Sequence, residues 1–470
     1  MKDKIVYLFF TFALLATIQL TSCNPESEEF APSVSTAISF SSDTVSFDTL
    51  ITNQLSVTHR LKIYNSNKSA TLIKKIGMRS MEQTPYEVII NGIPSHTLEN
   101  QKLFGNDSLM VLFSVTIPES EDSYPFKVED FLDIEFDSFS RSIPVLAWGE
   151  NTNQIEGQSH ITENTTWDDS KPYMLNDTLW IDQGATLSIA SGVKIYGNDN
   201  TAIIVNGSLE AIGTYESPIQ FTSWRQDDRY EDMFGQWGGI YFSENSKNNK
   251  FENVKIRNAQ NGIISDDNSD ISLHNTVIEN MTYNGVMNTN GVINASNTVI
   301  NNCGDYCIKS TGGTIDLKHS TLANFYYNLL VPGRNTHNAL VLIEDQSIQE
   351  DGTTSNYTVK LNLENNIIAC SSWQESIILN FINEGHETNI INNLINSRDE
   401  EMLNGNHASD FSMESLFTTP EEYNYTLNAE IEDHPATNKG NDIGIPVDLA
   451  NINREYPCSL GAFEFLLTEK

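Results

Sequence analysis

The side chains that could take part in catalysis lie in the second half of the chain. Lys309 and His337 are residue types that can act as a general base, and Arg334 could bind a carboxylate beside them. If the segments around them stack as successive strands, Asp266 and Asp267 lie two layers from Lys309, about 10 Å away. This combination predicts an acidic and basic groove that a polysaccharide lyase could use, with Ca²⁺ as its cofactor. The same residues also fit ordinary solvated positions.

A second set of residues has the composition of a sugar-binding face. Aromatic rings spaced along a surface can stack on sugar rings, while Asn and Asp side chains accept hydrogen bonds from hydroxyl groups. Tyr283 and Tyr327 share one repeat position with Asp305, and a loop after Ser223 adds aromatic and acidic residues. These aromatic residues could instead only cover the flank of the turns. The candidate ligand-binding residues are Trp224, Asp227, Asp228, Tyr230, Tyr283, Asp305 and Tyr327.

Both sets belong to a region that repeats every 22 residues. One column of the repeat holds Ile256, Ile278, Ile300 and Leu322, and a second, eight residues later, holds Ile264, Val286, Ile308 and Leu330. A fixed period in the low twenties is typical of a solenoid, in which no single repeat can bury its own apolar face. We expect both columns to point inward, with Glu279, which follows Ile278, facing water.

A third column of the repeat consists of asparagine. Asparagine tolerates the left-handed backbone conformation of a tight turn and can bond backbone groups there. In stacked parallel strands its side-chain amide can also bond the equivalent residue of the next layer. The column therefore predicts a structural ladder of Asn258, Asn280, Asn302 and Asn324.

The residues between these columns favour short strands over helices. Each repeat carries runs such as Thr276-Val277-Ile278, bounded by Asn, Gly and Asp. β-Branched runs of this kind are strands, and no helical period of apolar residues runs through a repeat. Leucine-rich repeats have a similar period but need several leucines in each repeat. The pattern therefore predicts a parallel β-helix, with lateral insertions at about 224–236 and 335–356.

The N-terminus has the pattern of an export signal. Lys2 and Lys4 precede an apolar run that is too short for a comfortable membrane span. The run ends in Leu20-Thr21-Ser22-Cys23, which closely resembles a bacterial lipobox. The resemblance implies cleavage before Cys23, acylation of that residue, and anchoring to a membrane as an outer-membrane lipoprotein. The acidic residues that follow resemble a surface-export signal, although a solvated tether would have the same composition.

Residues 31–150 have the pattern of a β-sandwich. About seven short strand-like runs occur there, and Val111-Leu112-Phe113-Ser114-Val115 alternates clearly. Their order resembles the immunoglobulin-like domains that accompany bacterial envelope modules, without a Cys-Trp-Cys core. This resemblance implies a spacer rather than a catalytic domain.

From Leu175 onward the chain resembles right-handed parallel β-helix lipoproteins. The resemblance rests on runs such as Ile203-Ile204-Val205 and Trp237-Gly238-Gly239-Ile240, and it implies an architecture and no activity. Arg454 and Leu460-Gly461-Ala462-Phe463-Glu464 resemble the segment that closes the last coil of such proteins. The predicted divisions are a signal peptide at 1–22, an acidic tether at 23–30, an immunoglobulin-like sandwich at 31–150, a linker or N-terminal cap at 151–174, the β-helix at 175–400 and a C-terminal cap at 401–470.

The overall charge limits the classes of partner. The chain has 470 residues and a formal charge of −36, which argues against nucleic acid, because phosphates require a basic patch. No Cys/His spacing for a metal is present. We expect a lipid-anchored protein of the cell envelope that binds or scaffolds without catalysis, with a polysaccharide as its leading ligand. The alternatives are a polysaccharide lyase or glycoside hydrolase, and an adhesin that binds protein.

Overall fold

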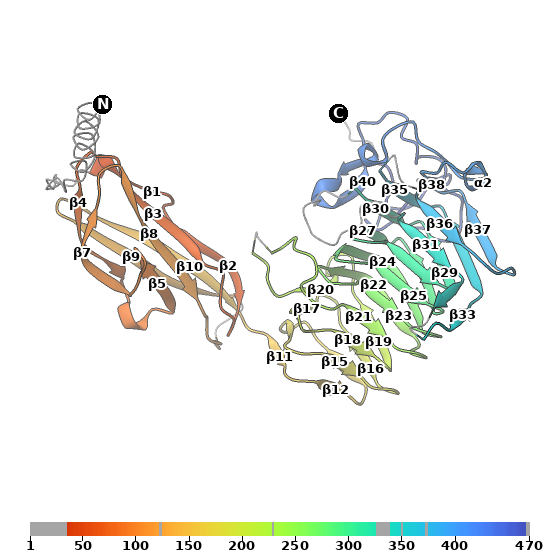
Figure 1. The fold of residues 1–470 in the computed structure, drawn as a ribbon, viewed down its shortest axis with the longest axis horizontal. Coiled ribbons are helices and arrows are strands. Elements are labelled where there is room, and N and C mark those ends of the chain that lie inside the picture. The colour runs from red at the N-terminus through yellow and green to blue at the C-terminus, as the bar shows by residue number, and fades with distance from the viewer. Residues whose placement is uncertain are drawn as a thin grey trace, which may run out of the picture. The chain divides into compact units, whose positions relative to one another are not determined.

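The computed structural model describes residues 35–121, 125–227, 230–325, 339–348, 351–371 and 375–466. They form two compact units, divided between Asn151 and Thr152 (Figure 1). Both units consist mainly of β-strands, which confirms the predicted all-β class. Within the described residues, no helix has the length and apolar character needed to cross a membrane.

The first unit is a sandwich of two five-stranded sheets. Neighbouring strands are antiparallel except for the parallel pair β2 and β10. In order across the first sheet, the strands are β1 (Ile38–Phe40), β3 (His59–Asn65), β8 (Asp107–Val115), β5 (Tyr86–Ile90) and β6 (Ile93–Pro94). In order across the second, they are β2 (Val45–Ile51), β10 (Ser140–Glu150), β9 (Phe126–Phe136), β4 (Thr71–Met78) and β7 (Thr97–Leu103).

Alternate residues of these strands form the core of the sandwich. Leu61 and Val111 from the first sheet and Ile134 and Val145 from the second are buried in one apolar cluster. Tyr86 lies in the same cluster, and its hydroxyl donates to the carbonyl of Val145 across the sandwich. The period-two alternation seen in the sequence therefore corresponds to one face of each sheet turned inward.

The second unit is a parallel β-helix, as the repeat predicts. One of its two long sheets has nine strands, each paired in parallel with its neighbours. In order, they are β12 (Ser159–Ile161), β15 (Leu179–Ile181), β18 (Ile203–Val205), β21 (Ile240–Phe242), β23 (Ile263–Ser265), β25 (Val286–Thr289), β28 (Ile308–Thr311), β31 (Val341–Glu344) and β36 (Ile377–Asn380).

The other long sheet contains two strands or strand segments from most coils. In order, they are β11 (Asn153–Ile155), β13 (Thr165–Trp167), β14 (Tyr173–Leu175), β16 (Thr186–Ile189), β17 (Lys194–Gly197), β19 (Ser208–Ile212), β20 (Ile219–Ser223), β22 (Asn249–Arg257), β24 (Asp270–Met281), β26 (Val292–Ser296), β27 (Val299–Cys303), β29 (Gly313–Lys318), β30 (Thr321–Asn324), β34 (Val359–Glu364), β35 (Ile367–Cys370), β37 (Glu387–Ile391) and β38 (Leu394–Ile395). Smaller elements are the β32–β33 hairpin (Gln346–Ile348, Thr354–Asn356), the β39–β40 hairpin (Phe417–Thr419, Asn424–Leu427) and α2 (Glu400–Leu403).

The first predicted apolar column is in register. Ile256 pairs with Ile278, Ile278 with Ile300, and Ile300 with Leu322, and all four side chains are buried in the core of the β-helix. Like residues therefore stack on like residues along this side of the interior.

The second predicted column is wrong by one residue in its first member. Ile263, not Ile264, pairs with Val286 and is buried, whereas Ile264 points outward. The turn between the two strands is one residue shorter after Ile256 than after Ile278, so the strict period of 22 fails there. A shift of one residue moves a strand's side chains to the opposite face. Leu330, the last predicted member, lies outside the described residues.

The predicted exposure of Glu279 is also wrong. Glu279 is 1% exposed and forms ion pairs with Lys255 at 2.8 Å and with Arg257 at 3.2 Å. Arg257 is paired in turn with Asp232, which lies on the insertion between β20 and β21. The side chain does point away from the interior, but the inserted residues fold over that outer face, and the charge is buried among partners.

Asparagine residues link successive coils at one turn. Asn258, Asn280 and Asn302 all have a left-handed backbone. Asn280 donates to Asn258 Oδ1 at 2.7 Å, and Asn302 donates to Asn280 Oδ1 at 2.8 Å. Asn324 instead donates to the carbonyl of Cys303. Nδ2 of Asn258 donates to the carbonyl of Glu231, and Nδ2 of Asn280 donates also to the carbonyl of Asp232, so both residues hold the insertion against the coils.

The segment that follows the last coil packs back along the β-helix. The Arg454 guanidinium is buried and bonds Glu464 at 2.8 Å and Asn297 Oδ1 at 2.9 Å. Phe417 and Leu460 cover the outward side chains of β27, β30 and β35. Residues 413–465 therefore cover a flank of several coils.

Candidate functional site

The outward face of the nine-stranded sheet presents one continuous row of side chains, which we call the outer stripe. Strand pairing places one residue of every coil in this row, at a spacing of about 4.8 Å. Most members are apolar or aromatic and partly exposed to solvent. The outer stripe consists of His160, Trp180, Ile204, Tyr241, Ile264, Met287, Lys309, Leu342 and Ile378.

Two aromatic residues of the stripe are held in place by polar neighbours. The ring of Trp180 lies parallel to that of His160, with 5.9 Å between centroids, and His160 Nδ1 lies 2.9 Å from Asp182 Oδ1. The hydroxyl of Tyr241 donates to Asp266 Oδ2 at 2.6 Å. Burial, assisted by this carboxylate, raises the pKa of Tyr241 to about 12, so the hydroxyl stays protonated. Both rings are therefore oriented before any ligand arrives.

A row of polar residues runs beside the stripe, two residues further along the chain in each coil from β15 onward. It contains carboxylates, amides and hydroxyls, and some neighbouring members bond each other, as Ser243 does with Asn206 at 2.7 Å. The row contains Asp182, Asn206, Ser243, Asp266, Thr289, Thr311, Glu344 and Asn380. An apolar strip flanked by hydrogen-bonding groups has the chemistry of a binding surface for an amphipathic ligand such as a sugar.

The turns that precede this sheet bring several predicted residues to the other flank of the stripe. Tyr283 is 44% exposed, and its carbonyl accepts from the backbone nitrogen of Asp305 in the next coil. Burial raises the pKa of Asp305, and the nearby positive charge of Lys309 partly offsets this increase. Lys309 itself lies in the outer stripe, with Nζ 6.0 Å from the centre of the Tyr306 ring. The structure thus brings Tyr283, Asp305 and Lys309 together.

The insertion of residues 224–236 contains the other described candidates. The Arg225 guanidinium lies over the rings of Trp224, at 5.1 Å, and Tyr230, at 4.3 Å. One face of each ring is therefore directed at a cation inside the loop. The carbonyl of Asp227 accepts from the backbone nitrogen of Tyr230 at 2.8 Å and closes the same turn.

Five predicted site residues lie outside the described residues. They are Cys23, Asp228, Tyr327, Arg334 and His337. Of the three candidate catalytic residues, only Lys309 is therefore placed. Among the described residues, no cluster of His, Cys, Asp and Glu could hold a metal ion. Cys303, Cys307, Cys370 and Cys458 are buried as free thiols.

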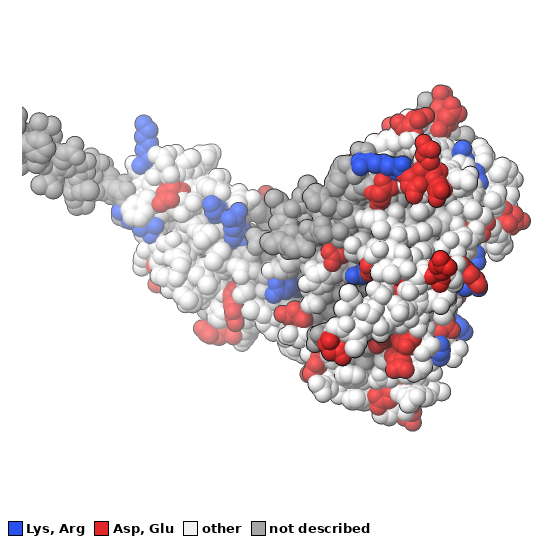
Figure 2. Space-filling view, turned by 45° about the vertical axis from the view of Figure 1, so that its right-hand side comes forward, with Lys and Arg blue, Asp and Glu red and all other residues white. Residues whose placement is uncertain are grey.

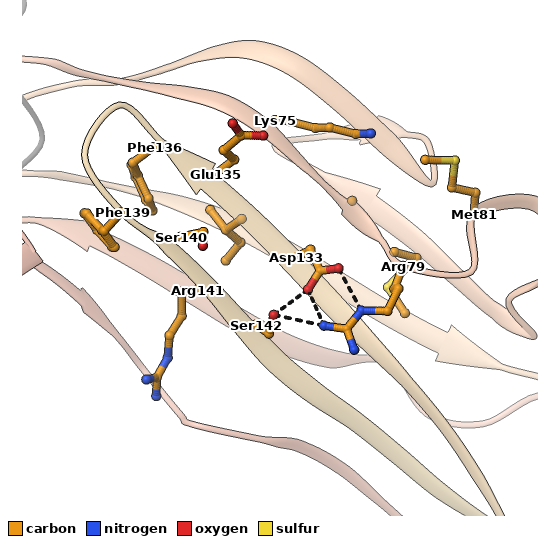
Figure 3. Close-up of a pocket in the computed structure, with 13 residues that line it drawn as sticks. Lys75, Arg79, Met81, Asp133, Glu135, Phe136, Phe139, Ser140, Arg141 and Ser142 are labelled. Carbon is orange, nitrogen blue, oxygen red and sulfur yellow. Dashed lines mark hydrogen bonds and ion pairs between the residues drawn. The ribbon is translucent and has the colours of Figure 1, made fainter.

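The first unit contains a cavity of about 620 Å³ over β4, β9 and β10 (Figure 3). Arg79 binds both carboxylate oxygens of Asp133, at 2.9 and 2.7 Å, and Ser142 bonds the same pair. The hydrogen bond from Arg79 lowers the pKa of Asp133. Because Arg79, Asp133 and Ser142 already bond one another in this cavity, we place the candidate site on the outer stripe of the second unit and not here.

Sequence reasoning missed Trp180, Ile204 and Tyr241, which precede the strict period of 22. They could have been found by aligning the short apolar triplets of successive strands. Each is the middle residue of an apolar triplet, as in Leu179-Trp180-Ile181 and Ile240-Tyr241-Phe242. In a triplet whose outer residues point inward, the middle residue must point outward.

The stacked parallel sheets of the second unit define a right-handed parallel β-helix. Residues 159–292 match a family model described as a pectate-lyase-like β-helix domain. No curated protein matches the chain in sequence.

Three solved structures show distant likeness. A family 123 glycoside hydrolase from Clostridium perfringens is 8% identical, with 28% of this chain and 30% of that one covered and a TM-score of 0.18. A protein of unknown function from Porphyromonas gingivalis W83 is 11% identical, with coverages of 29% and 60% and a TM-score of 0.18. The catalytic unit of a GH87 α-1,3-glucanase from Streptomyces thermodiastaticus strain HF3-3 is 10% identical, with coverages of 66% and 72% and a TM-score of 0.22. The chain thus spans under two thirds of the length of the first two.

Proposed function

We propose that the protein binds a glycan along the outer stripe, without cleaving it, at the surface of a cell envelope. The observation that carries this proposal is the row of Trp180, Ile204, Tyr241, Ile264 and Met287, with hydrogen-bonding residues beside it. Sugar rings combine apolar faces with equatorial hydroxyl groups, and the two parallel rows match both features.

The charges beside the stripe favour a neutral or cationic glycan. Asp182, Asp266 and Glu344 are spread along the polar row, and the chain as a whole is strongly acidic. Acidic groups also lie scattered over the face that Figure 2 shows. An anionic polymer would be repelled by this distribution.

The lipid anchor at Cys23 is part of the same proposal. An acylated Cys23, followed by an acidic tether and the first unit as a spacer, would hold the outer stripe away from the membrane. The lipobox pattern of Leu20-Thr21-Ser22-Cys23 supports it.

A glycan array followed by affinity measurements tests the proposal. We expect Trp180→Ala and Tyr241→Ala each to weaken binding by about tenfold, or about 1.4 kcal/mol. Tyr215→Ala is the matched control, because Tyr215 is also an exposed aromatic residue but lies outside the stripe, between β19 and β20. Unchanged affinity in both stripe variants would contradict the proposal.

The enzyme alternative is tested on the same ligands. A lyase would release unsaturated ends and a hydrolase new reducing ends, and Lys309→Ala would abolish release by a lyase while the ligand still binds. Binding without any such product supports a binding protein.

A further inference from the structure

The nine-stranded sheet ends in an open edge. β36 pairs with β31 on one side, and among the described residues no strand pairs with its other side. Val341 donates its backbone N–H to the carbonyl of Ser376. Because hydrogen bonds of a parallel strand alternate between its two sides, the backbone groups of Ile377 and Leu379 face away from β31.

The neighbouring sheet is closed differently. Residues after α2 return to its last strands, where His407 donates to the carbonyl of Asn393 and accepts from Ile395. Asn392 donates in the same way to the carbonyl of Gly405. The closing residues thus bond β38 and its flank, whereas no strand of the described part of the chain pairs with the free edge of β36. Open edges attract further strands unless charged or bulged residues protect them.

The side chains beside the open edge are apolar. Ile378 points outward from β36 and is 42% exposed, and Ile382, just after the strand, is 67% exposed. An added strand could place alternate apolar side chains against these two.

The charges around the edge select the partner. Residues 375–414 contain Arg398 as their only Lys or Arg, against the acidic residues Glu375, Glu384, Glu387, Asp399, Glu400, Glu401, Asp410 and Glu414. Two cations from other segments lie nearby, since Lys360 pairs with Glu387 at 3.1 Å and the carbonyl of Lys439 accepts from Asn392, and the region remains acidic on balance. The opposite end of the β-helix is acidic as well, with Glu156, Glu163, Asp168 and Asp169 against Lys171. Stacking the two ends of separate copies would therefore bring like charges together, whereas a cationic strand would be attracted.

We propose that the open edge of β36 binds an extended cationic peptide segment of another protein, as a tenth, parallel strand of this sheet. Backbone hydrogen bonds to Ile377 and Leu379 hold the segment, Ile378 and Ile382 receive its apolar side chains, and the acidic residues attract its basic ones. This site meets the glycan proposal only at Ile378, the last member of the outer stripe, because its backbone contacts lie on the edge of the sheet and not along its face.

The test uses a short fluorescent peptide of alternating lysine and valine, added to the full chain. We expect it to bind, to be weakened by salt, and to slow hydrogen exchange at residues 377–381. A peptide of alternating glutamate and valine should not bind, and neither should a lysine–valine peptide with a central proline, which lacks the required N–H. Ile378→Lys should weaken binding by about tenfold or more. Ile212→Lys, an equally exposed isoleucine at the end of β19, should not.

Thermal melting of both variants shows whether each remains folded. If Ile378→Lys unfolds, the exchange result and the proline peptide still decide the matter. Equal binding by folded Ile378→Lys and wild type, binding of the proline peptide, or unchanged exchange in β36 would each overturn the proposal. Concentration-dependent self-association that Ile378→Lys abolishes would make a second copy the occupant, and would also overturn it.

Discussion

Replacing Asn280 by alanine tests what the asparagine ladder contributes. Asn280 is fully buried, donates to Asn258 Oδ1 and to the carbonyl of Asp232, both at 2.7 Å, and accepts from Asn302 at 2.8 Å. Alanine removes all three bonds and leaves three polar groups, two of them on buried asparagines, without these partners, at about 1 kcal/mol each. It must also adopt the φ of 64° found at this turn, which costs about 1 kcal/mol more. The expected loss is about 4 kcal/mol.

Two further variants separate the hydrogen-bond contribution from the backbone contribution to this loss of stability. Asn280→Gly keeps the turn accessible and loses only the hydrogen bonds, so we expect about 3 kcal/mol. Asn268→Ala changes an exposed asparagine with a φ of 55°, and we expect about 1 kcal/mol from the backbone alone.

Urea unfolding read by hydrogen-exchange mass spectrometry on peptides from β22 and β24 reports on the β-helix without the sandwich. Asn280→Ala should also expose residues 224–236 to protease, because the bond to Asp232 is lost. If Asn280→Ala loses no more stability than Asn268→Ala, the ladder contributes nothing beyond its backbone conformation and the reasoning is refuted.

Three other perturbations have defined outcomes. Glu279→Lys should destabilise the β-helix by several kcal/mol, comparably with Ile278→Asp, because it places a third cation against Lys255 and Arg257. A melting shift no larger than that of an exposed Glu→Lys change would show that the cluster is solvated. Burial, reinforced by Arg454, lowers the pKa of His319 to about 3, below its unfolded value of about 6.5. The neutral imidazole therefore contributes its full stability above pH 6.5, and the free energy of unfolding falls by about 3 kcal/mol on acidification to pH 4. His319→Asn, which suits the left-handed turn, should flatten the acid unfolding curve, and an unchanged curve would count against this assignment. Cys23→Ser should release the protein from membranes on fractionation, and a processed variant that stays membrane-bound would rule out the lipid anchor.

Much of the fold could be predicted from the sequence, because a solenoid repeats the same local problem in every coil. The inward column of Ile256, Ile278, Ile300 and Leu322 follows from identical spacing, since stacked strands must keep their apolar sides together. The asparagine turns follow from the same spacing and from the tolerance of asparagine for left-handed backbone.

The candidate site could be predicted only in part. Tyr283 and Asp305 could be proposed from the sequence because they share a repeat position, but the row of Trp180, Ile204 and Tyr241 precedes the strict period. The face of Ile264 was misplaced because a single residue of turn length reverses which side chains point inward.

By itself, the sequence determined which residues alternate between the two sides of each strand, because this alternation is a property of the local backbone. Only the tertiary structure decided which outward side chains meet water. Glu279 is buried because inserted residues fold over it, and Asn297 is bonded by Arg454, 157 residues further along the chain. Burial of an outer face depends on segments far away in sequence, and no local period records their position.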